Sequence, residues 1–474
     1  MFFKSRTSRQ GRVKRSDLKR TIQKRDKALA VFLYLIAAIG LFISPFIGCQ
    51  SKNKEIAPHP TAVIAGGSMV PALLGKHHSL VCNDCKFPFP VDSTNPPDSG
   101  YAVCPNCGYD KVVYDVAKPK QSETIPIQTG NKNIQRWDLA AFRFGQTKKK
   151  GVKRVVGLPG ETILIKNGDV WVNGKLAQRP WPLRKQMMIS HYDSRYVPTS
   201  INISSRWNLE NNQNWTFKDR QFIWRGSDDS ESESTGLNYQ PVHCFASKNN
   251  RKPLNYVPDI YGFNQNLNRI ELNVVDQIFV KFPMKLDAHC YLTFSTSCGG
   301  NDIVFKVDPT SEQVSIHADS KSTTATLPTS TKISNQLDVG FCTFDSRPTL
   351  LIGGKPICEL DLTETAETVD GSAKKSRLEF DIRIHEHPSL ESFDSSSTAR
   401  MGTLGPIQIN RDLYYFSDHA SKFTLADDEF LLLGDNVPIS IDSRNWDEPA
   451  IPRKQILGTL ELESPKKMNN PQLP

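Results

Sequence analysis

Residues 66–71 read Gly-Gly-Ser-Met-Val-Pro, and this stretch decides how the rest of the chain is interpreted. Two later stretches belong with it. Residues 153–161 read Lys-Arg-Val-Val-Gly-Leu-Pro-Gly-Glu, and residues 434–444 read Gly-Asp-Asn-Val-Pro-Ile-Ser-Ile-Asp-Ser-Arg. A serine, a lysine in a β-branched run and a Ser-x-Asp-Ser-Arg element therefore follow one another in order.

Length and composition limit the possible classes of protein. The chain has 474 residues, of which 38% are hydrophobic, as in a globular protein of two or more domains rather than a multi-spanning membrane protein. Much of the net charge of +9 lies in residues 1–27, where only Asp17 and Asp26 are acidic. Such a tail can bind nucleic acid, but an apolar run follows directly, so we expect a role in membrane topology and no nucleic-acid partner.

The apolar run from Ala28 to Gly48 has no charged side chain and is about long enough for one transmembrane helix. Positive charge before a first span holds that end in the cytoplasm, which places the later residues on the outer face. The alternative is a lipoprotein signal cleaved before an acylated Cys49. The length of the run and the atypical Phe46 favour a retained anchor. Either interpretation exports the rest of the chain.

A serine hydroxyl is a poor nucleophile at neutral pH and needs a base nearby. Lysine can be that base only when its pKa falls from about 10.4 toward neutrality, which burial among apolar groups achieves. Lys153 has Val152, Val155 and Val156 as neighbours. Alternation along a strand can turn Lys153 into an apolar site while Arg154 points the other way.

Taken together, the three stretches resemble the type I signal peptidase, or leader peptidase, family. The resemblance implies a mostly β catalytic core in which Ser68 is the nucleophile and Lys153 the general base. It also implies that Ser440 orients the Lys153 amine. Asp442 would form an ion pair behind the dyad with Arg154 or Arg444. The resemblance covers the apolar run and residues 60–75, 135–180 and 405–465.

A protein of this kind would be a membrane-anchored serine endopeptidase that removes N-terminal signal peptides from exported preproteins through an acyl-enzyme. Its expected location is the bacterial inner (plasma) membrane, single-pass, with the catalytic core on the periplasmic face. Catalysis would need no cofactor. The expected partners are signal-peptide-bearing preproteins, the lipid bilayer and the secretion translocon.

One departure from the family pattern affects the oxyanion site. Many members carry a hydroxyl residue two positions before the nucleophile, where this chain has Gly66. Met69 and Pro71 complete the motif as an apolar filler and a rigid turn residue. The departure leaves a catalytically weak or silent membrane-anchored scaffold as the alternative. A self-cleaving repressor-type protease is disfavoured because a span occupies the place of its DNA-binding head.

Two C-x-x-C pairs, Cys82 with Cys85 and Cys104 with Cys107, have the spacing of a zinc ribbon. Four thiolates close a tetrahedral site, so the predicted role of the metal is structural. Two disulfides are the competing interpretation, because the segment is predicted to lie in an oxidising compartment. His77 and His78 precede the ribbon without a partner at metal-ligand spacing and are treated as surface residues.

A long insertion separates the second stretch from the third. It begins with Asn-rich and acidic-serine segments such as residues 227–233, which cannot fold alone. Apolar residues then alternate, which predicts short strands of a sandwich or jelly roll. The alternating positions are Ile270, Leu272, Val274; Ile278, Val280, Phe282; Cys290, Leu292, Phe294; Ile303, Phe305, Val307; and Leu378, Phe380, Ile382, Ile384.

The resulting domain plan is a catalytic core interrupted by two insertions. In chain order it has a basic tail (1–27), a transmembrane helix (28–48), a first core segment (49–81), a zinc ribbon (82–107), a second core segment (108–180), a poorly ordered insertion (181–262), a β insertion (263–400), a third core segment (401–465) and a tail (466–474). Two disulfides are also plausible among the insertion cysteines, which are Cys244, Cys290, Cys298, Cys342 and Cys358.

Overall fold

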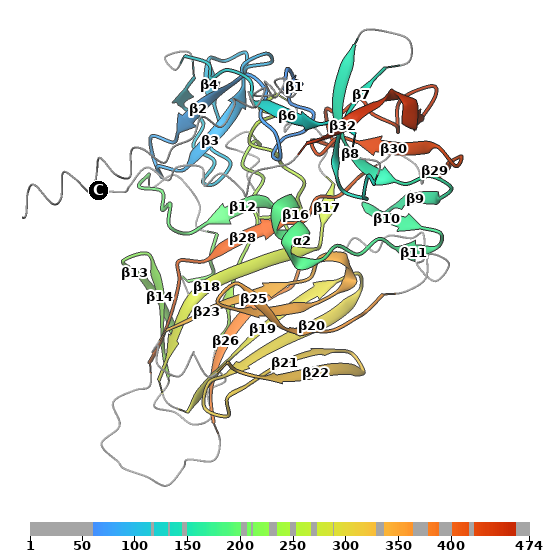
Figure 1. The fold of residues 1–474 in the computed structure, drawn as a ribbon. Coiled ribbons are helices and arrows are strands. Elements are labelled where there is room, and N and C mark those ends of the chain that lie inside the picture. The colour runs from blue at the N-terminus through green and yellow to red at the C-terminus, as the bar shows by residue number, and fades with distance from the viewer. Residues whose placement is uncertain are drawn as a thin grey trace, which may run out of the picture. The chain divides into compact units, whose positions relative to one another are not determined.

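The structure is a computed structural model, drawn in Figure 1. It describes residues 60–114, 118–130, 133–144, 149–200, 206–209, 212–226, 235–246, 253–266, 273–287, 289–328, 336–363, 378–387, 401–416 and 421–460. The basic tail, the apolar run at 28–48 and Cys49 lie outside these residues. Within them, no helix has the length and apolar character that crossing a membrane requires.

The prediction of a mostly β chain is confirmed. Strands make up most of the regular structure, and the α-helix of the described residues is α2 (Trp181–Met187), which begins after Pro180. Two short 3-10 turns are η4 (Phe344–Ser346) and η6 (Arg453–Gln455). Alternating β-branched and aromatic residues explain this preference, because they pack well on a pleated surface with one buried face.

The serine, lysine and Ser-x-Asp-Ser-Arg stretches meet at a seven-stranded sheet with the order β1-β6-β32-β7-β8-β30-β31. Its strands are β1 (Thr61–Val63), β6 (Thr124–Gln128), β7 (Leu139–Arg143), β8 (Lys150–Gly157), β30 (Glu429–Leu433), β31 (Ala450–Pro452) and β32 (Ile456–Leu460). Strand β8 pairs antiparallel with both β7 and β30. The lysine stretch is therefore inside the sheet, next to the strand that leads into residues 434–444.

A four-stranded sheet shares a core with the first. Its strands are β9 (Thr162–Lys166), β10 (Asp169–Val172), β11 (Lys175–Leu176) and β29 (Ser421–Thr424), in the order β11-β10-β9-β29. Val156 of β8 and Leu431 of β30 pack with Ile163 and Ile165 of β9 in one buried cluster. This common core holds the two sheets together around the site.

The paired cysteines belong to a lobe of two small hairpins. Strand β2 (His77–Val81) pairs with β3 (Pro88–Asp92), and β4 (Tyr101–Ala102) pairs with β5 (Val112–Val113). The core of this lobe consists of the four cysteines with a few apolar side chains, so little apolar area is buried. A fold with so small a core usually needs a cross-link or a metal.

Two larger sheets face each other across the most extensive core of the described chain. The nine-stranded sheet contains β12 (Ile189–Asp193), β13 (Trp215–Lys218), β14 (Gln221–Arg225), β18 (Ile278–Leu286), β23 (Leu337–Cys342), β24 (Thr349–Ile352), β25 (Lys355–Glu359), β27 (Met401–Leu404) and β28 (Gln408–Arg411). The six-stranded sheet contains β15 (Leu237–Asn238), β19 (Cys290–Cys298), β20 (Asn301–Asp308), β21 (Gln313–Ala318), β22 (Lys321–Thr326) and β26 (Phe380–Glu386). A separate pair joins β16 (Val257–Pro258) with β17 (Val274–Val275).

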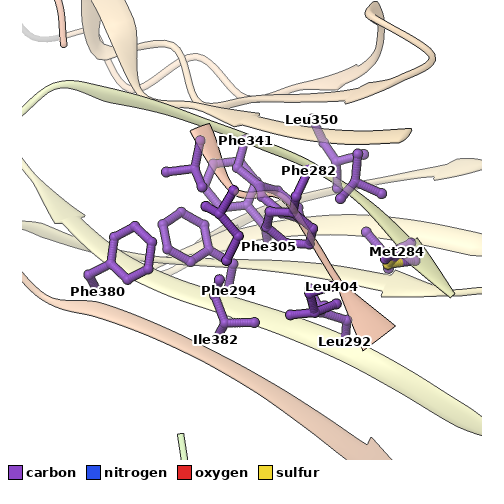
Figure 2. Close-up of a cluster of buried hydrophobic side chains, with 14 of the residues drawn as sticks. Phe282, Met284, Leu292, Phe294, Phe305, Phe341, Leu350, Phe380, Ile382 and Leu404 are labelled. Carbon is purple, nitrogen blue, oxygen red and sulfur yellow. The ribbon is translucent and has the colours of Figure 1, made fainter. Parts of the chain in front are cut away.

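Figure 2 shows aromatic side chains of both sheets meeting in this core. The ring of Phe341, from β23, lies 5.3 Å from the rings of Phe294 and Phe305, which come from β19 and β20. The alternating positions predicted from Ile278 onward in β18, β19 and β20 are buried as expected. Ile270 and Leu272 lie outside the described residues.

The strand pairing differs from the predicted domain boundaries. Strands β13 and β14, from the segment predicted to be poorly ordered, pair into the nine-stranded sheet, and β14 pairs with β27 of the third core segment. Trp215 and Trp224 are buried there. The prediction failed because the polar composition of residues 181–262 dominated, while the apolar partners of these tryptophans lie far away in sequence. Residues 227–233 lie outside the described ranges.

Two smaller expectations were wrong. His77 and His78 are buried rather than on the surface, since the Nδ1 atom of His77 lies 2.8 Å from the Gly75 carbonyl and the His78 ring contacts Tyr114 edge to face. The five insertion cysteines are buried, and within the described residues none of them forms a disulfide. Cys290, Cys298 and Cys358 pack in the large apolar core as small hydrophobic side chains do, whereas the Cys244 sulfur contacts the Arg206 guanidinium.

Candidate active site

Ser68 lies in a tight turn a few residues after β1. The next side chain, Met69, is buried at 1% exposure and packs with Ile64 and Leu73. Backbone hydrogen bonds from Val70 to the Gly67 carbonyl and from Leu73 to the Met69 carbonyl close the turn. The buried methionine thus anchors the turn, whereas the neighbouring Ser68 is half-buried.

Lys153 lies on β8 with only 5% of its surface exposed. Its Nζ atom donates a hydrogen bond of 2.6 Å to Ser440 Oγ, and Ser440 Oγ donates one of 2.7 Å to Asp442 Oδ2. Because the Ser440 proton is committed to Asp442, Ser440 can only accept from the lysine. A neutral Lys153 amine that donates one N–H to Ser440 keeps its lone pair for another group.

Burial lowers the pKa of the Lys153 ammonium to about 8. The negative charge of Asp442 opposes this shift, and the positive charge of Arg444 adds to it. A lysine with this pKa is neutral in about one molecule in ten at pH 7, many times more often than an ordinary surface lysine. The local electrostatics therefore make Lys153 a usable base near neutral pH.

Arg444 is the residue that pairs with Asp442. Its Nε and Nη2 atoms donate to the two carboxylate oxygens at 2.9 and 2.7 Å, and the Gly434 N–H adds a third bond of 2.9 Å. Burial alone would raise the pKa of the Asp442 carboxyl, but the contacts with Arg444 outweigh it and the pKa is lowered. Asp442 is therefore a fixed anion behind Ser440.

Arg154 pairs with a different carboxylate from the one expected. Its Nε and Nη2 atoms donate to Asp435 at 2.8 and 2.5 Å, and its Nη1 atom donates to the Trp137 carbonyl at 2.7 Å. Both partners are almost fully buried. Of the two alternatives for Asp442, Arg444 is thus the partner, and Arg154 holds the Gly-Asp-Asn turn against β8.

The turn at residues 434–436 is bonded to the segment that contains Ser68. The Asn436 N–H donates to the Ser68 carbonyl at 3.0 Å, and Asn436 Nδ2 donates to the Gly67 carbonyl at 2.9 Å. A Cβ on Gly434 would lie 2.0 Å from Ser440 Oγ and 2.7 Å from the Ser68 carbonyl oxygen. Only glycine at this position leaves room for both the Ser440 side chain and the Ser68 carbonyl. In the described residues, these contacts join Ser68 to Lys153 without a direct hydrogen bond between the two side chains.

Gly66 is exposed, and a Cβ placed on it would meet no heavy atom within 4 Å. The missing hydroxyl is therefore not excluded by steric crowding. Gly67 differs, since a Cβ there would lie 2.5 Å from the Phe263 ring.

The four cysteines of the two C-x-x-C pairs converge, with their sulfur atoms all within 4.8 Å of one another. The Cys82 and Cys107 sulfurs are 3.7 Å apart and those of Cys85 and Cys104 are 3.6 Å apart. A disulfide needs about 2.05 Å. Sulfurs around one tetrahedral zinc, each about 2.3 Å from the ion, are about 3.8 Å apart. The donor set and the distances fit a structural zinc.

Part of the chain is similar to a known protein family. Residues 59–230 match the family model described as signal peptidase, peptidase S26. The matches support the type I signal peptidase family. Signal peptidase I V of Bacillus subtilis (strain 168) is 46% identical over 50 residues, which are 10% of this chain and 29% of that protein. Signal peptidase I of Bacillus caldolyticus is 39% identical over 57 residues, which are 12% of this chain and 31% of that protein.

The matched stretches span about three tenths of each of these signal peptidases. The family match includes Ser68 and Lys153, whereas residues 434–444 lie beyond it, so the placement of Ser440 and Asp442 rests on the geometry above. Among solved structures, a native glycosidic hydrolase has a TM-score of 0.27 and 8% identity over 44% of this chain and 90% of that chain. A similarity at that level supports no inference.

Several contacts in the site were not predicted. Asp435 binds Arg154 and Asn436 bonds the segment that contains Ser68, and neither contact was expected. The Asp-Asn pair directly after a glycine was an available signal for such a role. Tyr261 and Asn264, which also contact this turn, come from the insertion, and no local pattern marks them.

Metal analysis tests the cysteine cluster. We expect about one zinc per chain in the purified protein, and we expect Cys104→Ser to abolish binding and lower the melting temperature. Cys358→Ser is the matched control, because Cys358 is buried among apolar residues of the large core. A metal-free protein in which the four thiols prove to be oxidised would contradict the zinc site.

Proposed function

We propose that the protein is a membrane-anchored serine endopeptidase that removes N-terminal signal peptides from exported preproteins, with Ser68 as nucleophile and Lys153 as general base. The observation that carries this proposal is the buried Lys153 amine, which is held by Ser440 and Asp442 on a turn bonded to the Ser68 segment. The family match over residues 59–230 supports the same chemistry.

The proposed reaction is acyl transfer. Neutral Lys153 takes the proton of Ser68 as the Ser68 oxygen attacks the scissile carbonyl carbon, and the resulting ammonium then protonates the leaving amine as the C–N bond breaks. In the second half, the amine takes a proton from water, and the hydroxide oxygen attacks the acyl-enzyme carbonyl. The proton returns to the Ser68 oxygen as the ester bond breaks.

Ser440 and Asp442 are positioning residues in this scheme. The hydrogen bond from Lys153 to Ser440 fixes the direction of the amine lone pair, and Asp442 fixes the Ser440 hydroxyl as an acceptor. Arg444 neutralises Asp442, so the carboxylate stabilises the protonated lysine less than an unpaired one would. The supporting groups thus hold the amine while its pKa stays near 8.

The substrate is proposed to be an extended peptide with small side chains before the cut. Strand β1, which leads toward Ser68, pairs with β6 on one edge and lies at the end of the seven-stranded sheet as far as the structure describes it. An extended peptide can bind such an edge by main-chain hydrogen bonds. We place the chain in the bacterial inner membrane through residues 28–48, with preproteins, lipid and the secretion translocon as partners.

Substitution of the dyad tests the proposal directly. Ser68→Ala and Lys153→Ala, in the full chain in detergent, should each abolish cleavage of a preprotein while the circular dichroism spectrum stays unchanged. Lys150→Ala, on the exposed start of the same strand, should retain wild-type activity. Cleavage near the wild-type rate in either dyad variant would exclude the assignment. A wild-type chain that cleaves no preprotein but binds partners would favour the scaffold alternative.

The pH dependence follows from the pKa of Lys153. Below about pH 8 the amine is mostly charged and cannot accept a proton, so kcat/KM should rise about tenfold per pH unit and level off above pH 8. Asp442→Asn removes a charge that raises this pKa, so the midpoint should move to lower pH, with reduced activity from loosening of Ser440. A midpoint that moves upward in Asp442→Asn would contradict this electrostatic role.

Gly66→Ser should restore a side-chain donor to the oxyanion site. The position has room for it, and one such donor is worth about 10² to 10³ in kcat where it is well placed. We expect at least a tenfold rise in kcat with little change in KM. Gly66→Ala is the control, since it adds the Cβ without the hydroxyl. Equal kcat values for the two variants would show that the hydroxyl does not reach the oxyanion.

A further inference from the structure

A short segment of the long insertion lies directly against the nucleophile turn. This segment, Tyr261–Gln265, follows β16 and precedes β17 in sequence. Its side chains are almost fully buried, with exposures of 3% for Tyr261, 2% for Phe263, 5% for Asn264 and 2% for Gln265. Buried polar groups in a connecting segment need specific partners, which identify what the segment does. We call it the strap.

One side of the strap contacts the candidate active site. The side-chain amides of Asn264 and Asn436 form a reciprocal pair, with Asn264 Nδ2 to Asn436 Oδ1 at 2.6 Å and Asn436 Nδ2 to Asn264 Oδ1 at 2.9 Å. Tyr261 Oη donates to the Asp435 carbonyl at 2.8 Å. The Phe263 ring fills the space beside Gly67.

The other side of the strap contacts the cysteine lobe. The side-chain amide of Gln265 accepts from the Val103 N–H at 2.8 Å and donates to the Val103 carbonyl at 3.2 Å. A Cβ on Gly262 would lie 2.9 Å from the Pro105 ring. Val103 and Pro105 flank Cys104, so the strap lies between the second C-x-x-C pair and the nucleophile turn.

Asn436 depends on the strap for some of its hydrogen bonds. Its side-chain amide donates to both the Gly67 carbonyl and Asn264 Oδ1, and its side-chain oxygen accepts from Asn264. Without Asn264, a buried donor and a buried acceptor of Asn436 lose their partner, and the amide can rotate to recover them. Such a rotation would release the Gly67 carbonyl, next to the nucleophile. A misplacement of about 1 Å in reacting groups can cost about a hundredfold in rate.

We infer that the strap positions the nucleophile, and that Asn264 is a positioning residue that acts through Asn436 on the Gly67–Ser68 backbone. The inference rests on the proposed function of Ser68. With this role, the insertion contributes to the active site and is more than a spacer.

The test compares Asn264→Ala, Asn436→Ala and the double variant in preprotein cleavage by the full chain. Asn264→Ala should lower kcat ten- to a hundredfold with KM within about twofold. The midpoint of the pH profile should stay at the wild-type value, because the charged neighbours of Lys153 are unchanged. The double variant should be no slower than Asn436→Ala alone, since both act on the same contact. Asn266→Ala, whose side chain bonds the Pro96 carbonyl instead, should match wild type.

The other possible results distinguish a failure of this inference from a failure of the proposed function. A kcat for Asn264→Ala within twofold of wild type, or losses that simply add in the double variant, would overturn the strap while leaving the proposed function intact. If wild type fails to cleave and Ser68→Ala makes no difference, the proposed function falls and this inference falls with it. If Asn264→Ala does not fold, Tyr261→Phe, which removes only the hydroxyl bonded to Asp435, should still lower kcat two- to tenfold; an unchanged kcat would reject the strap.

Discussion

The candidate site depends on a lysine amine that is buried without a direct carboxylate partner among the residues that the structure describes. Lys153 bonds Ser440, and the negative charge of Asp442 lies one hydroxyl further away and is already paired with Arg444. A carboxylate in direct contact would raise the pKa of the amine and hold its proton. The intervening hydroxyl gives orientation without that cost. The positions of β8, the 434–444 segment and the turn that contains Ser68 all maintain this arrangement.

Buried ion pairs hold the segments of the chain around the amine. Arg154 joins β8 to Asp435, and Arg179, which follows β11, lies between Asp345 of the insertion and Asp412. Such pairs add little net stability compared with apolar packing, but breaking one leaves an uncompensated buried charge at a cost of about 3–5 kcal/mol. Their effect is to fix the positions of the joined segments relative to one another. The large insertion is therefore tied to the strands of the candidate site at defined points, and the strap is one more such connection.

The sequence predicted those features of the site that the family resemblance carries over to matching residues. Lys153 in its valine run and the spacing from Gly434 to Arg444 fit the family pattern, and the structure brings Lys153, Ser440 and Asp442 together. Contacts that form only in the tertiary structure were not predictable from the sequence pattern. Asn264 and the buried His77 are examples. Composition misled for residues 181–262, where polar stretches hid Trp215 and Trp224, because their apolar neighbours come from strands far along the chain.

The burial of Lys153 also bears on the choice between an enzyme and a silent scaffold. A lysine whose pKa falls from 10.5 to about 8 destabilises the folded state by about 3 kcal/mol. That penalty is fully present below about pH 8 and disappears above about pH 10.5, where the amine is neutral in both the folded and the unfolded chain.

In a protein that is only a scaffold, the buried lysine would destabilise the folded state at neutral pH without serving a function. An apolar side chain of similar length would fill the same space without this penalty. Ionisable groups held with perturbed pKa values concentrate at functional sites, and a base that must be neutral to act is the role that requires this burial. The buried amine therefore favours chemistry at Ser68 over a purely structural role.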